Sequence, residues 1–211
     1  MRIVAHVASL TPLALLVWDS LQDRLTADPI REVTLRTGRY ALILLTSSLA
    51  CTPVYGLLRR IEVKRLQGIR RQVMLVRRPL GLYAFLYAGL HLLTFVGLDY
   101  GFALGLVVEE IRGKRFIQIG LAAFLSLVPL AITSTRGWRK RLGTRWKRLH
   151  RLVYLSALFA VLHFVWLVKA DLRRPLTYGA VVVLLLVARV PWIGKRDKEN
   201  PSPASHAEPP L

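Results

Sequence analysis

Residues 79–98 read PLGLYAFLYAGLHLLTFVGL, a run of twenty residues with no Lys, Arg, Asp or Glu and one histidine, His91. A helix that crosses a bilayer needs about 20 mostly apolar residues, because the hydrocarbon core is about 30 Å thick and a helix rises about 1.5 Å per residue. This run meets that requirement, and five other runs resemble it. The sequence therefore predicts an all-α, polytopic membrane protein with six transmembrane helices, at residues 3–18, 39–58, 79–98, 116–133, 149–168 and 175–192.

The charges of the chain lie between these runs. The formal net charge is +19, from 31 Lys and Arg against 12 Asp and Glu, while 54% of the residues are hydrophobic. A charge this high also occurs in nucleic-acid-binding proteins. Here the basic residues form the loops between apolar runs, where membrane proteins carry their topology signals. We therefore expect membrane lipid, and no nucleic acid, to face the basic loops.

The distribution of Lys and Arg among the loops predicts the orientation. Eight of them lie between the second and third runs and seven between the fourth and fifth, against three in each of the alternate loops. Because Lys and Arg accumulate in cytoplasmic loops, the basic loops and both termini are predicted to be cytoplasmic. Residues 1–194 form the predicted membrane domain, and the Pro-rich, charged segment 195–211 is predicted to be a disordered cytoplasmic tail.

Two histidines occupy equivalent places in their runs. His91 lies twelve residues into 79–98 and His163 fourteen residues into 149–168, which places them roughly 18 Å and 21 Å along helices that leave the same membrane face. Small residues lie seven and three positions before each histidine: Ala84, Ala88, Ser156 and Ala160. A flat macrocycle between two helices needs such small residues, and two facing imidazoles give a six-coordinate iron suited to electron transfer. The pattern favours haem held by His91 and His163.

These histidines have other possible interpretations. Small residues at this spacing also allow plain contact between membrane helices. Intramembrane histidines can serve as a proton relay in a transporter, although no run here has a central Asp or Glu. They can also be incidental in a structural subunit. Two matched patterns at matched depth favour haem over each of these alternatives.

A third histidine, His150, begins the fifth run near the predicted cytoplasmic surface. A second haem there would need a histidine at equal depth on the third run, where the chain has Arg77 and Arg78 instead, and His6 is a poor partner. A histidine beside lipid headgroups is an equally good interpretation. Imidazole beside Arg77, Arg78 and Arg145 suits an anionic ligand, such as a flavin phosphate, or a quinone. The sequence thus favours one haem and a separate cofactor at this face.

Four stretches resemble the MsrQ (YedZ) family, the haem-binding membrane subunits of bacterial MsrPQ methionine sulfoxide reductase systems. They are ADPIREVTLRTGRYAL (27–42), RRPLGLYAFLYAGLHLLTF (77–95), AITSTRGWRKRLGTRWKRLHRLVY (131–154) and LHFVW (162–166). The resemblance covers residues 5 to 192, and it extends more distantly to the ferric reductase-like transmembrane domain of NADPH oxidases. One tract, IRGKRFIQIG (111–120), departs from the family pattern.

The resemblance implies that His91, His150 and His163 are the functional histidines, with b-type haem and FMN as cofactors. It implies a place in the bacterial cell inner membrane. Electrons are expected from the quinone pool or a cytoplasmic flavin reductase, and they are expected to reach a periplasmic molybdopterin reductase, MsrP, that repairs oxidised proteins. The substrate chemistry would then belong to the partner subunit. The chain itself has no dinucleotide-binding fingerprint and no P-loop, so its electrons must come from outside it.

Overall fold

A computed structural model describes residues 2–61, 67–168 and 170–189, and every regular element in them is helical. This agrees with the predicted all-α class. The elements are α1 (Arg2–Leu21), α2 (Pro29–Arg60), α3 (Gln67–Leu93), the π-helix η2 (Thr94–Asp99), α4 (Leu104–Gly113), α5 (Arg115–Ile132), α6 (Arg136–Leu149), α7 (Leu152–Leu167) and α8 (Arg173–Val187).

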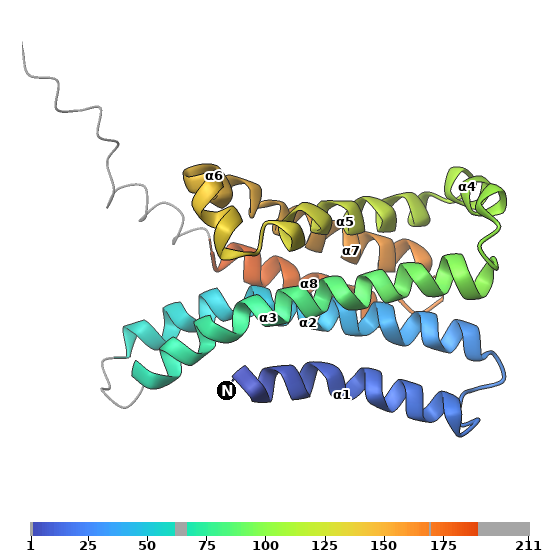
Figure 1. The fold of residues 1–211 in the computed structure, drawn as a ribbon, viewed down its shortest axis with the longest axis horizontal. Coiled ribbons are helices and arrows are strands. Elements are labelled where there is room, and N and C mark those ends of the chain that lie inside the picture. The colour runs from blue at the N-terminus through green and yellow to red at the C-terminus, as the bar shows by residue number, and fades with distance from the viewer. Residues whose placement is uncertain (1, 62–66, 169, 190–211) are drawn as a thin grey trace, which may run out of the picture.

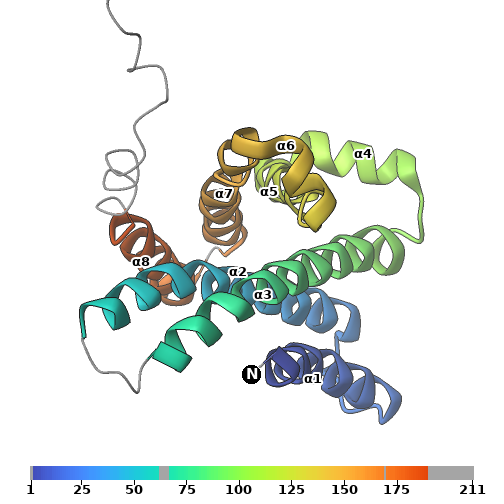
Figure 2. The same cartoon turned by 60° about the vertical axis from the view of Figure 1, so that its left-hand side comes forward.

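The long helices lie side by side along the long axis of the molecule (Figure 1). Helices α2 and α3 pack against each other as one pair, and α5 and α7 form a second pair. Helix α1 lies at the edge of the bundle beside α3, and α8 lies beside α7 and α2 (Figure 2). The two pairs therefore bring α3 and α7, which carry His91 and His163, into one bundle.

Within the described ranges, four helices are long and apolar enough to cross a membrane: α1, α2, α3 continued by η2, and α5. Helices α6 and α7 would make a fifth span if they are counted together, with a bend of 49° between them. Helix α8 has only 15 residues, fewer than the roughly 20 that a span needs. The count of six spans stays a prediction, since the last predicted run continues to residue 192 and the predicted tail 195–211 also lies outside the described residues.

Several helices differ in extent from the predicted runs. Helix α2 begins at Pro29, ten residues before the predicted start, because the Asp28 side chain accepts a hydrogen bond from the Arg31 amide at 3.1 Å and caps the helix. Pro29 suits the first turn, where its missing N–H leaves no bond unmade. Helix α3 likewise begins at Gln67, twelve residues before Pro79. Helices α4 and α6 were not predicted, because α4 is short and α6 is strongly basic.

The interior is small and mostly aliphatic. Its buried cluster consists of Leu45, Leu49, Ala84, Leu127, Leu130, Ala157 and Val182. Many other large apolar side chains point outward; for example, Leu57 and Leu184 are 61% and 67% exposed. Outward-facing apolar side chains are what a helix bundle presents to lipid.

A buried arginine stabilises the middle of α2. Pro53 has no N–H, so the carbonyl of Leu49, four residues earlier, lacks its usual helical donor. The guanidinium of Arg189, just after α8, donates through Nη2 to this carbonyl and through Nη1 to the Tyr154 hydroxyl at 3.1 Å. Arg189 is only 3% exposed. It therefore links α8 to α2 and α7 at a point where α2 has lost a bond of its own.

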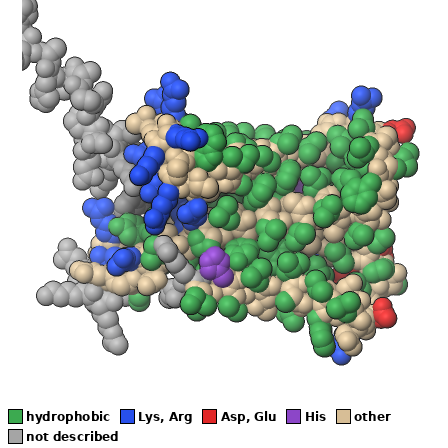
Figure 3. Space-filling model, in the orientation of Figure 1, with side chains coloured by type: hydrophobic (Ala, Val, Ile, Leu, Met, Phe, Trp, Pro, Cys, Tyr) green, Lys and Arg blue, Asp and Glu red, His purple; other side chains and the backbone are tan. Residues whose placement is uncertain are grey.

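Acidic and basic side chains gather at opposite ends of the bundle (Figure 3). All the acidic residues that the structure describes lie at the end where α1 meets α2 and α3 meets α4: Asp19, Asp23, Asp28, Glu32, Asp99, Glu109, Glu110 and Asp171. The other end, where α2 meets α3 and α6 lies, carries most of the arginines. The loop bias found in the sequence is thus a polarity of the whole molecule.

Candidate functional site

His91 of α3 and His163 of α7 lie together, close to the acidic end of the bundle. Their ring centroids are 6.0 Å apart, and the ring planes meet at 77°. Both side chains are partly buried. The pair that the sequence matched by depth is therefore a spatial pair.

Each histidine is held by the backbone of a neighbouring helix. His91 Nδ1 lies 2.8 Å from the carbonyl oxygen of Thr34 in α2, and His163 Nδ1 lies 2.7 Å from that of Phe116 in α5. A carbonyl can only accept, so Nδ1 carries the proton and donates in both cases. The Nε2 atom of each ring keeps its lone pair, which is the arrangement that metal-ligating histidines commonly show.

The pair fits a haem iron by donor type and by spacing. Two metal–imidazole bonds of about 2 Å, and about 1 Å from nitrogen to ring centre on each side, add to about 6 Å. This agrees with the 6.0 Å between the centroids of His91 and His163. Two neutral imidazoles are also the ligand set of a six-coordinate haem iron.

The small residues before the histidines divide into two groups. Ala84 is buried in the aliphatic cluster, and the Ser156 hydroxyl lies 2.6 Å from that of Ser126. These two residues serve helix packing, which corrects the expectation that the whole row faces a macrocycle. Ala88 and Ala160, one turn before each histidine, are partly exposed. Ala88 also packs against the edge of the aliphatic cluster, so the two groups differ in exposure.

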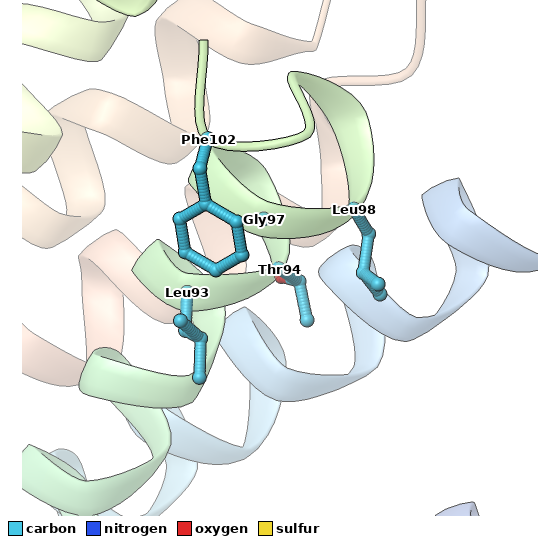
Figure 4. A pocket seen from close by; sticks show the side chains of 5 residues that line it. All are labelled: Leu93, Thr94, Gly97, Leu98 and Phe102. Atoms are coloured by element: carbon cyan, nitrogen blue, oxygen red, sulfur yellow. The ribbon is translucent and has the colours of Figure 1, made fainter. Parts of the chain in front are cut away.

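The chain beyond His91 changes to a π-helix, η2. Thr94 at its start donates its hydroxyl to the His91 carbonyl at 2.8 Å. Next to it lies a cavity of about 290 Å³ lined by Leu93, Thr94, Gly97, Leu98 and Phe102 (Figure 4). The lining is apolar apart from the Thr94 hydroxyl, so this cavity suits hydrocarbon and supplies no set of metal ligands.

His150 has a different environment, between α6 and α7. Its ring stacks on Trp146 with centroids 3.9 Å apart, and its Nε2 lies 3.1 Å from the Thr133 hydroxyl oxygen. That hydroxyl donates its own proton to the Pro129 carbonyl at 2.6 Å. His150 Nε2 is therefore the donor to Thr133. The nitrogen that stays free in His91 and His163 is engaged here.

The three candidate arginines are placed differently. Arg77 is partly buried and close enough to His150 to act on it electrostatically, and its carbonyl accepts the Ser48 hydroxyl at 3.0 Å. Arg78 and Arg145 are exposed. His6, the weak alternative partner for His150, instead lies 2.9 Å from the Tyr83 hydroxyl of α3.

Sequence reasoning missed the residues that support the histidines. The carbonyls of Thr34 and Phe116 carry no side-chain signal, because any residue supplies a carbonyl. Gly38 and Gly120 face His91 and His163. Their positions could have been noticed in the sequence, because each is a glycine inside or beside a predicted span. Arg189, which supports α2 and not the histidines, lies inside the sixth predicted run, 175–192, and was not singled out there.

The chain matches a known family model over most of its bundle. The model described as "Ferric reductase like transmembrane component" matches residues 37–161. This range includes His91 and His150, and it ends two residues before His163.

Curated relatives are similar over nearly the whole chain. Proteins of Xanthomonas axonopodis pv. citri and Xanthomonas campestris pv. campestris are 43% and 44% identical, covering 99% of this chain and 93% of their own length. A protein of Caulobacter vibrioides is 41% identical, covering 93% of this chain and 89% of its own length. Each of these relatives is named "Protein-methionine-sulfoxide reductase heme-binding subunit MsrQ".

Proposed function

Because this chain belongs to the ferric reductase-like transmembrane family and to its MsrQ haem-binding subunits, we propose that it is the membrane electron-transfer subunit of a methionine sulfoxide reductase system, with b-type haem between His91 and His163. One observation carries the proposal. The two rings lie 6.0 Å apart with each Nδ1 bonded to a carbonyl, which leaves two Nε2 atoms as ligands.

Haem held by two imidazoles supplies reversible one-electron transfer and has no open coordination position for a substrate. The residues of this chain hold the rings and fix their tautomer through the carbonyls of Thr34 and Phe116. The reduction of methionine sulfoxide then belongs to a partner. We assign that role to a periplasmic molybdopterin reductase of the MsrP type.

We infer the direction of electron transfer from the separation of acidic and basic residues at the two ends of the bundle. The rule that basic loops stay inside puts the arginine-rich end in the cytoplasm and the acidic end in the periplasm of a bacterial inner membrane. His91 and His163 lie near the acidic end. An electron held there is close to the side on which a periplasmic partner would accept it.

The opposite end is proposed to receive electrons from the quinone pool or from a cytoplasmic flavin reductase. The stacked rings of His150 and Trp146, with Arg77 nearby, offer a flat aromatic surface and a cation. A flavin such as FMN combines a planar ring with a phosphate that arginine binds well. Arg78 and Arg145, exposed at this end, are further candidates for its phosphate.

Replacing His91 or His163 with Ala tests the haem assignment. Each variant is expected to lose at least most of its reduced-haem absorption, because six-coordinate iron then lacks one ligand. The measurement is the oxidised and dithionite-reduced visible spectrum of purified protein, with haem and flavin quantified per chain. His6→Ala serves as the control, since His6 is exposed and bonds to Tyr83. Full haem content in both test variants would contradict the pairing.

A further inference from the structure

The two histidines rest against their neighbouring helices in the same way. A Cβ atom added to Gly38 would lie 3.0 Å from His91 Nδ1 and 3.1 Å from its Cε1. A Cβ atom added to Gly120 would lie 2.6 Å from His163 Nδ1 and 2.9 Å from its Cε1. In both cases the imidazole occupies the space that a side chain would take, and Nδ1 is the nearest atom.

At both histidines, the carbonyl that accepts the Nδ1 proton has the same position in sequence relative to the glycine. Thr34 precedes Gly38 by four residues, and Phe116 precedes Gly120 by four residues. Residues four apart lie one above the other on a single face of a helix. Each histidine therefore meets a glycine and, one turn earlier on the same face, the carbonyl that accepts its Nδ1 proton. We call each such pair, Thr34 with Gly38 and Phe116 with Gly120, a glycine notch.

We propose that the two glycine notches position the iron ligands and set the reduction potential of the haem. This inference rests on the proposed function. A missing Cβ lets the ring approach close enough for Nδ1 to donate to the carbonyl, and this bond makes Nε2 a stronger electron donor to the metal. A stronger donor stabilises ferric over ferrous iron, so the notches lower the reduction potential. Gly38 and Gly120 are positioning residues, since they act through His91 and His163.

The two notches differ in tightness. The added Cβ would come closer to the ring at Gly120 than at Gly38, by 2.6 Å against 3.0 Å. The His91 side also has a second fixture, because Thr94 donates to the His91 carbonyl and its hydroxyl oxygen lies 3.2 Å from that of Thr34. Alanine at position 120 should therefore disturb its histidine more than alanine at position 38.

The test compares Gly38→Ala and Gly120→Ala with Gly105→Ala, a helical glycine with nothing within 4 Å of an added Cβ. Haem per chain, the low-spin spectrum and the midpoint potential are measured on purified full-length protein. We expect an upward shift of the potential in both notch variants, larger for Gly120→Ala, and the wild-type potential in Gly105→Ala. Loss of haem with an unchanged circular dichroism spectrum and elution volume would also support the notch.

Wild-type potentials in both notch variants would overturn the inference. If Gly120→Ala fails to fold, Gly38→Ala decides, because its milder contact allows the helix pair to form. Failure of this inference is distinguishable from failure of the proposed function. If His91→Ala loses its haem while both glycine variants keep the wild-type potential, only the notch inference is wrong. If both His91→Ala and His163→Ala retain their haem, the haem assignment itself is wrong.

Discussion

Arg189 illustrates how a single side chain can repair a helix. Pro53 leaves the Leu49 carbonyl without its helical donor, and the guanidinium that fills the gap comes from a residue far along the chain. A carbonyl left unpaired in an apolar interior costs about 1–3 kcal/mol. The proline and the arginine therefore depend on each other, although neither position suggests the other in the sequence.

This dependence predicts a coupling between two substitutions. Arg189→Leu should lower the free energy of unfolding by about 1–3 kcal/mol, because it strands the Leu49 carbonyl. In a Pro53→Ala background the loss should be smaller, since alanine restores the N–H that the carbonyl needs. Thermal unfolding in detergent measures all four proteins of the cycle. An equal loss in both backgrounds would show that Arg189 acts only through Tyr154.

At the scale of elements, α1 lies at the edge of the bundle and is joined to it by a few polar contacts. The hydroxyl of Tyr87 in α3 donates to the Ser9 carbonyl at 2.7 Å, and Tyr87 is 0% exposed. At the acidic end, Arg36 of α2 binds Asp19 of α1 at 2.6 Å. Helix α1 is thus held to α3 by Tyr87 in its middle and by the exposed His6–Tyr83 contact near its start, and to α2 by the Asp19 ion pair near its end.

Tyr87→Phe should loosen α1 and leave the α5–α7 pair unaffected. Removing one buried hydrogen bond costs about 1 kcal/mol, and the loss falls on the contact between α1 and α3. Hydrogen exchange of peptides from α1 should become faster, while peptides from α5 and α7 keep their rates. Tyr83→Phe is the matched comparison: it removes the exposed His6 contact between the same two helices and should accelerate exchange in α1 less than Tyr87→Phe does. Equal acceleration in every helix would refute the assignment.

Hydrophobic runs were enough to predict most long helices and the pairing of His91 with His163. The fourth run was placed closely at 116–133, where α5 extends over Arg115–Ile132. Other features left no such pattern. The cap at Asp28 extends α2 beyond its apolar run. The roles of Ala84 and Ser156 in helix packing depend on which helix lies beside them, here α5 with Ser126, and the sequence pattern does not give that neighbour. Backbone acceptors such as Thr34 were invisible because every residue has a carbonyl.

At the scale of the molecule, the separation of acidic and basic ends makes the orientation testable. Cys51 is the one cysteine of the chain and is 6% exposed, so a Cys51→Ala background carries no thiol. Added to it, Asp23→Cys should react with a membrane-impermeant maleimide in intact cells. Arg141→Cys should react only after the inner membrane is permeabilised. The reverse pattern would contradict a cytoplasmic basic end.

The glycine notches also bear on how such a protein can change over evolutionary time. A main-chain acceptor survives any amino-acid replacement at positions 34 and 116, whereas a larger residue at the glycine four positions later would crowd the imidazole. Natural variation can therefore change most residues of the helix segment beside an iron-ligating histidine and keep that histidine in place. Within the tract 111–120, the side chain of Phe116 is free to change while its carbonyl keeps the bond to His163, and Gly120 keeps the space that the ring occupies.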